Sequence, residues 1–133
     1  MLIAITSEGS ELNSLVAEKF GRTPFIILFD TEKKTFESLC NPYAYLFGGA
    51  GIQTAQFIIE KNVSAVITVD IGPNPLRFLK STDVKVYSCS RKQVHEVVEE
   101  FLEQKLPDVE QEAVINFSRK RHRGKRKNRN KKN

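Results

Sequence analysis

The order of its apolar segments constrains this chain more than any other feature. Short aliphatic runs alternate with longer segments in which apolar residues recur every three or four positions, which is typical of strands joined by amphipathic helices. The most strand-like run, residues 63–69, is apolar on both faces and rich in β-branched residues. Such a strand belongs in the centre of a sheet covered on both sides. The sequence therefore predicts an α/β fold.

Five strands and three main helices are expected. The predicted strands cover residues 2–6, 24–29, 35–40, 63–69 and 84–87. The predicted helices begin near Ile52, Pro73 and Ser90, and the last runs to Glu103. A further helix before Gly21 is indicated by the helical spacing of four apolar residues, with Ser10 as its cap. Those four are Leu12, Leu15, Val16 and Phe20.

The order of the main elements predicts a three-layer α/β/α sandwich. A hairpin followed by right-handed crossovers gives a mixed five-stranded sheet in the order 3-2-1-4-5, with strand 2 antiparallel. The loops after strands 1, 3, 4 and 5 then meet at one edge, where ligands usually bind in open α/β folds. We call this edge the rim; it comprises residues 6–22, 40–51, 70–74 and 88–91.

Two rim loops have a backbone chemistry that suits an anion. Gly48, Gly49 and Gly51 place small residues and free N–H groups where a helix begins, and the helix dipole favours negative charge there. Gly72 and Asn74 do the same at the next helix. The alternative is that these glycines only let the chain turn and let the helix pack closely on the sheet. The pattern is neither GxGxxG nor a phosphate loop, so no nucleotide is specifically indicated.

The net charge of +5 averages two different segments. Residues 119–133 hold ten of the 21 Lys and Arg and no acid, which leaves 11 bases against all 16 acids in residues 1–118. This tail has no apolar side chain to offset the entropy of ordering, so we expect it to be disordered. An acidic linker, residues 107–118, separates it from a domain at residues 1–106.

The basic tail is a candidate for sequence-independent contact with RNA or DNA phosphates. The alternative is a tail that stays solvated or folds back on the acidic body. The tail residues expected to contact phosphates are Arg119, Lys120, Arg121, Arg123, Lys125, Arg126, Lys127, Arg129, Lys131 and Lys132.

Five motifs along residues 1–106 resemble the dinitrogenase iron–molybdenum cofactor biosynthesis family. They are EKFGRTPF from residue 18, NP from 41, GGAGIQTA from 48, IGPN from 71 and VKVY from 84. The resemblance implies a ribonuclease H-like fold and a small cytoplasmic protein. Some members carry the nitrogenase cofactor or its iron–sulfur precursor between metallocluster assembly proteins. It therefore implies a non-enzymatic carrier.

The ligands of an iron–sulfur or iron–molybdenum cluster are the point where this chain departs from the family. Members commonly have a histidine in the stretch that here contains Lys19, and a protonated ammonium cannot ligate iron. Lys19 and Arg22 could instead attract an anionic cluster by charge. Cys40 and Cys89 are the remaining soft ligands. Their strands lie at opposite sheet edges, roughly 19 Å apart, so two separate half-buried thiols are the alternative.

Catalysis and membrane insertion are not expected. Ribonuclease H-type nucleases need a carboxylate cluster that begins on the first strand, and residues 2–6 contain no acid. Asp70 and Glu8 are the only rim acids of note, and no Ser-His-Asp or Cys-His arrangement occurs. The longest apolar run, residues 25–29, is far too short for a membrane helix. Two cysteines are too few for a secreted disulfide framework, which agrees with a cytoplasmic location.

Overall fold

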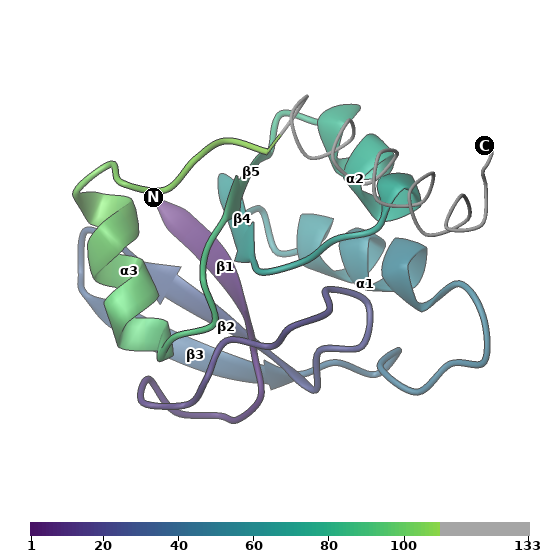
Figure 1. Cartoon of the computed structure of the whole chain (residues 1–133), viewed down its shortest axis with the longest axis horizontal. Helices are drawn as coiled ribbons and strands as arrows, with labels where there is room; N and C mark the ends of the chain where they lie inside the picture. The colour runs from purple at the N-terminus through teal and green to yellow at the C-terminus, as the bar shows by residue number, and fades with distance from the viewer. Residues whose placement is uncertain (110–133) are drawn as a thin grey trace, which may run out of the picture.

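The computed structural model describes residues 1–109 and shows a mixed five-stranded sheet between two helical layers (Figure 1). The strands are Leu2–Ser7 (β1), Phe25–Asp30 (β2), Thr35–Cys40 (β3), Ala65–Thr68 (β4) and Lys85–Ser88 (β5). The helices are Ala50–Ile59 (α1), Pro73–Lys80 (α2) and Val94–Leu102 (α3).

The strand order is β3-β2-β1-β4-β5, which confirms the predicted fold class and topology. β2 is antiparallel to β1 and β3, whereas β1, β4 and β5 are parallel. Ile5 lies at the centre, paired with Ile27 on one side and with Ile67 on the other. Because β1, β3, β4 and β5 all point the same way, the loops that follow them meet at the rim.

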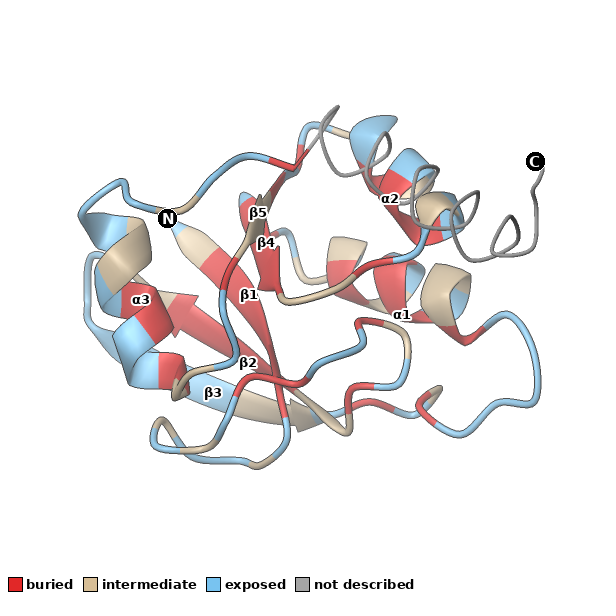
Figure 2. Cartoon of the chain, in the orientation of Figure 1, coloured by how far each residue is buried: buried red, intermediate tan, exposed pale blue. Residues whose placement is uncertain are grey.

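Side chains alternate between two apolar layers, as a sheet buried on both faces requires. Figure 2 shows the central strands largely buried: β4 is buried along its whole length, whereas Leu2 of β1 and Phe25 and Asp30 of β2 are only partly buried. On one face the strands pack under α1 and α2 through Ala4, Ile26, Leu28, Val66 and Val86. On the other face they pack under α3 through Ile3, Ile5, Ile27, Ala65 and Ile67.

Helix α3 begins at Val94, later than the predicted start at Ser90, and a capping box fixes the start. The Gln93 backbone N–H donates to Glu96 Oε1 at 3.1 Å, and the Gln93 side chain in turn accepts a backbone N–H of the first turn. Lys92, just before the helix, pairs with Glu100 at 2.5 Å. The helix buries Val94, Val97 and Val98 against the sheet.

The predicted helix before Gly21 is wrong: residues 8–20 form an irregular loop laid along the rim. One turn closes where the Ser14 N–H donates to the Glu11 carbonyl at 3.0 Å, and most of the other backbone hydrogen bonds of the loop go to other segments. The Ala17 N–H donates to the Thr6 carbonyl at 3.1 Å, and the Val16 N–H donates to the Lys92 carbonyl at 2.8 Å. Val16, Ala17 and Phe20 are therefore buried by tertiary contacts, which give a helix-like spacing without a helix.

The described chain ends on the free edge of β5. The Ser88 N–H donates to the Pro107 carbonyl at 3.0 Å, and the Val109 N–H donates to the Val86 carbonyl at 3.0 Å. Residues 107–109, expected as the start of a linker, thus add a short antiparallel segment to the sheet. The rest of that linker and the basic tail, residues 119–133, lie outside the described residues. Within residues 1–109, no helix is long and apolar enough to cross a bilayer.

Candidate functional site

The first turns of α1 and α2 lie against each other at the rim. A Cβ placed on Gly51 would come within 2.9 Å of Pro75 Cγ, and one placed on Gly21 would come within 2.9 Å of the Gly51 nitrogen. Gly51 is therefore needed for close packing, which is one of the two roles that the sequence left open. Gly21 plays the same part, although the sequence pattern placed it only at the end of a predicted helix.

Gly48 and Gly49 face open space instead. No atom of the described chain lies within 4 Å of a Cβ placed on either residue. Gly49 is the N-cap residue immediately before α1, with a φ of 77°, a left-handed conformation that favours glycine. No side chain caps the free N–H groups of the first turn of α1, and that turn carries no acidic residue. The positive end of the α1 dipole is thus open to a ligand beside Gly48 and Gly49.

The start of α2 contributes fewer donors. Gly72 begins the helix in an extended conformation, without a side-chain cap or an acid in the first turn. Pro73 and Pro75 have no N–H, so Asn74 is left as the donor of that turn. The Asn74 side-chain oxygen already accepts a hydrogen bond from Arg77 at 2.7 Å. We expect α2 to add mainly its dipole to the field at the rim.

Arg22 and Lys19, the two cationic residues predicted at the rim, have different roles in the structure. The Arg22 guanidinium donates to the Ala44 carbonyl at 3.1 Å and also to the Leu46 carbonyl, so it holds the loop before α1. Lys19 is exposed, and its backbone bridges to Asp70 at the end of β4. Arg22 therefore shapes the site, whereas Lys19 remains available to pair with an anion.

A buried polar network fixes the loops around this site. The Asn41 amide donates to the Thr23 carbonyl at 3.0 Å and to Thr54 Oγ1 at 2.9 Å. Thr54 Oγ1 donates to the Gly21 carbonyl at 3.3 Å, and the Ser7 N–H donates to Thr23 Oγ1 at 2.9 Å. Sequence reasoning did not assign a role to Thr23 or Thr54. The one available signal was a threonine on the apolar side of α1.

The structure does not bring the two cysteines together. Cys40 is exposed at the end of β3, whereas Cys89 is buried beyond the end of β5, in the apolar cluster that also contains Ile67 and Val94. Three strands separate them, which amounts to about 19 Å at the usual strand spacing. Burial, aided by the Glu100 carboxylate, raises the pKa of the Cys89 thiol to about 12. The pair does not fit a shared thiolate site for iron.

Carboxylate and histidine side chains of residues 1–109 do not form a metal site in place of the cysteines. Across residues 1–109, no group of three or more His, Cys, Asp or Glu side chains could hold a metal ion. Of the rim acids, Glu8 is paired with Arg91 at 3.1 Å. The predicted nucleic-acid contacts, Arg119 to Lys132, lie outside the described residues. What the rim offers a ligand is thus N–H groups, helix dipoles and Lys19.

The fold and this rim define a small α/β/α domain with a glycine-lined edge. The family model described as dinitrogenase iron-molybdenum cofactor matches residues 1–104, so the chain belongs to that family. The resemblance seen in the five sequence motifs is confirmed.

Solved structures and a curated protein resemble this chain over most of their length. The apo form of the orange protein from Desulfovibrio gigas is 29% identical with a TM-score of 0.78, covering 81% of this chain and 92% of that one. A candidate NifB protein from Thermotoga is 32% identical with a TM-score of 0.72, covering 82% and 93%. An uncharacterized protein of Methanocaldococcus jannaschii is 28% identical over 101 residues, which is 74% of this chain and 86% of that one.

Proposed function

We propose that this chain is a non-enzymatic binding protein that holds a small anionic ligand at the rim, against the first turn of α1. The observation that carries the proposal is the contact between Gly51 and Pro75, because it sets two helix N-termini side by side. Neither helix has a side-chain cap or an acid in its first turn to neutralise that end. The positive ends of two helix dipoles, together with the free N–H groups of the first turn of α1, stabilise negative charge.

The family favours an anionic metallocluster, or its iron–sulfur precursor, as the cargo. Some of its members carry the nitrogenase cofactor or its precursor between assembly proteins, so metallocluster assembly proteins are the partners that we propose. The hydrogen-bond donors and charges at the rim determine how the protein would hold such a cargo. Because Cys40 and Cys89 cannot reach one cluster, the contacts fall to the N–H groups beside Gly48 and to the Lys19 ammonium. Charge and hydrogen bonding then replace coordination by thiolates.

The test is cargo retention under anaerobic conditions. The full chain is incubated with ferrous iron, sulfide and molybdate, desalted, and analysed for iron, sulfur and molybdenum. We expect Gly48→Val, which fills the open space, and Lys19→Gln, which removes the charge, each to lower retention several-fold. Lys80→Gln removes the same charge from an exposed position in the last turn of α2 and serves as the matched control.

A double cysteine variant provides the measurement that could contradict the rim site. A chain with both Cys40→Ser and Cys89→Ser should retain as much metal as the parent. Complete loss of the metal in that double variant, with Gly48→Val and Lys19→Gln unchanged, would assign the cargo to thiolates and overturn the rim site.

A second candidate function rests on the tail alone. Residues 119–133 carry ten bases and no acid, a density that favours contact with nucleic-acid phosphates. In this proposal the folded body is a platform and the tail makes the contact. The tail has no aromatic residue, so base stacking is not part of it.

A further inference from the structure

An apolar groove lies between the last turn of α3 and the start of β1, and we call it the α3 groove. Its volume is about 460 Å³, and its apolar lining consists of Met1, Tyr87, Phe101, Leu102 and Leu106. Met1 is 51% exposed and Leu102 40%, so much of this lining faces solvent. Figure 1 shows the N-terminus beside the end of α3. A contiguous apolar surface of this kind marks an interaction site.

The described chain ends beside the α3 groove. Leu106 lines the groove, and residues 107–109 then run antiparallel to β5, where the Val109 N–H donates to the Val86 carbonyl at 3.0 Å. Because β5 points toward the rim, an antiparallel segment leads away from the rim. The chain after Val109 is therefore directed toward the end of the sheet where β1 begins and β2 ends, which is the end that the groove occupies.

The composition of residues 110–133 selects the part of the chain that suits the groove. None of the side chains that line the groove in the described chain is charged, so the basic residues 119–133 do not match it. The apolar residues that follow Val109 are confined to one short stretch: Ala113, Val114, Ile115 and Phe117. We propose that residues 113–117 of the same chain occupy the α3 groove.

The length of the chain permits this contact. Residues 110–117 can span up to roughly 26 Å when extended, whereas β5 and β2 are three strand spacings apart, about 14 Å. Residues 110–112 separate the proposed segment from the last described hydrogen bond. Closing so short a connection costs little entropy, and this favours a segment of the same chain over a separate molecule.

Charge and aromatic packing favour the same placement. The antiparallel bridge between Tyr87 and Asp108 sets a register in which Glu110 would lie across from Lys85, an exposed cation at the start of β5. Opposite charges in such a cross-strand position are stabilising. The rings of Tyr87 and Phe101 meet edge to face with centroids 5.2 Å apart, and Phe117 would add a third ring to them.

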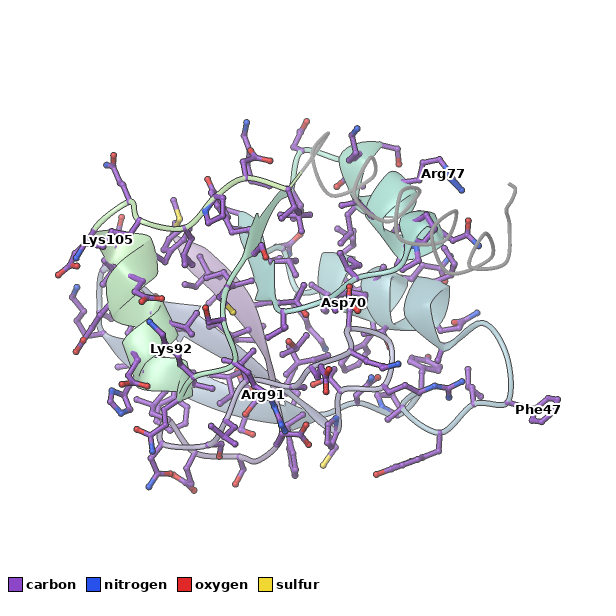
Figure 3. All side chains as sticks on the ribbon, in the orientation of Figure 1. Phe47, Asp70, Arg77, Arg91, Lys92 and Lys105 are labelled. Carbon is purple, nitrogen blue, oxygen red and sulfur yellow. The ribbon has the colours of Figure 1, made fainter. Side chains whose placement is uncertain are left out.

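This placement separates the basic tail from the rim. The tail begins directly after residues 113–117, so it would leave the fold at the end of the sheet opposite the rim. Figure 3 shows how far apart these ends lie, with Lys105 in the loop after α3 at one end and Phe47 of the rim at the other. A nucleic acid held by the tail would therefore leave the rim open, and the contact itself depends on neither proposed function.

A double-mutant cycle in the full chain tests the contact by thermal unfolding. Leu102→Ser and Phe117→Ser should each lower the thermal midpoint by about 4 °C or more. The double variant should lose much less than the sum, because both changes remove the same contact. Leu15→Ser is the matched control, since Leu15 is 43% exposed but lies on the loop at residues 8–20. Its loss should add to that of Phe117→Ser.

Disulfide trapping shows which chain fills the groove. Leu102→Cys with Phe117→Cys, in a Cys40→Ser background, leaves Cys89 as the third thiol, and that thiol is buried. Oxidation by dioxygen should join residues 102 and 117 within one chain, so the product keeps the monomer mass. Leu15→Cys with Phe117→Cys in the same background should give little of the corresponding product.

Three results would overturn the proposal. Additive losses for Leu102→Ser and Phe117→Ser would show that the two side chains do not meet. An unchanged thermal midpoint in Phe117→Ser would show that the residue is not buried. A disulfide that joins residues 102 and 117 only between two chains would assign the groove to the segment of a second copy.

Discussion

Gly51 of α1 lies directly against Pro75 of α2, so closely that one added methyl group would sit 2.9 Å from the proline ring. The contact joins two helices that cover the same face of the sheet, at the end where each begins. Pro75 is rigid and buried among closely packed core side chains. Neither Pro75 nor the backbone at Gly51 can therefore move aside without a cost in stability. The distance between the two helix N-termini is therefore set by the absence of a side chain at residue 51.

Because of this contact, Gly51 and Gly48, which are three residues apart, should differ in how strongly a substitution affects stability. Gly51→Val should lower the free energy of unfolding by about 1–3 kcal/mol, because the added side chain overpacks the contact with Pro75. Gly48→Val should change it by no more than about 0.5 kcal/mol, since the space there is open. Urea unfolding followed by circular dichroism measures both. If Gly48→Val destabilised the chain as much as Gly51→Val, the open surface beside α1 would be disproved.

The apolar pattern was enough to predict the strands and their order. Residues 63–69 are apolar on both faces, and this marks β4 as a covered strand whatever its neighbours are. The loop at residues 8–20 could not be predicted in the same way. Val16 and Phe20 are buried because the chain crosses strand ends there, and the partners of its N–H groups, such as the Lys92 carbonyl, are remote in sequence.

The candidate site was only partly predictable for a similar reason. A glycine-rich segment before an apolar helix indicates a helix start near a rim, and Gly49 is indeed the N-cap residue of α1. The sequence cannot show that Gly51 meets Pro75 while Gly48 meets nothing, because that depends on how two helices pack. The strand order, by contrast, was enough to separate Cys40 from Cys89, since it sets their strands at opposite edges.

The hydrogen bond between Asn41 and Thr54 gives a second prediction. Thr54 is 0% exposed, and Thr54→Val would leave the Gly21 carbonyl and one Asn41 amide hydrogen without this partner. Unsatisfied buried polar groups cost about 1–3 kcal/mol, so we expect a loss of that size in urea unfolding. Thr35→Val makes the same change at an exposed position and should leave stability within about 0.5 kcal/mol. Equal effects in the two variants would mean that the network adds no stability.

Cys89 gives a pH-dependent prediction. Burial raises its thiol pKa from 9.0 to about 12, so above pH 9 the unfolded chain releases a proton that the native chain keeps. The unfolded state then binds fewer protons, and this contribution to stability is present below pH 9 and lost as the pH rises toward 12. Cys89→Ala should flatten the fall in unfolding free energy across that window. Cys40→Ala, at an exposed position, should keep the slope of the parent.

The reactivity of the same two thiols checks that interpretation independently. A thiol reagent at neutral pH should modify Cys40 rapidly and Cys89 only on unfolding, because the thiolate is the reactive form and Cys89 is both protonated and covered. Rapid modification of both residues in the folded chain would contradict the buried environment of Cys89.

Removing residues 119–133 separates the tail from the rim. The truncation changes the net charge from +5 to −5 and deletes no residue of the described fold, so the thermal midpoint should move little. If the tail contacts nucleic acid, the full chain should bind generic RNA with an affinity that falls steeply as salt rises, and the truncated chain should not bind. A full-length chain with the ten tail bases replaced by glutamine controls for length and should behave like the truncated one. Metal retention at the rim should survive both changes, because Gly48 and Lys19 lie in the folded body. RNA binding that persists without the tail would move the contact to the acidic body, where phosphate repulsion makes it least expected.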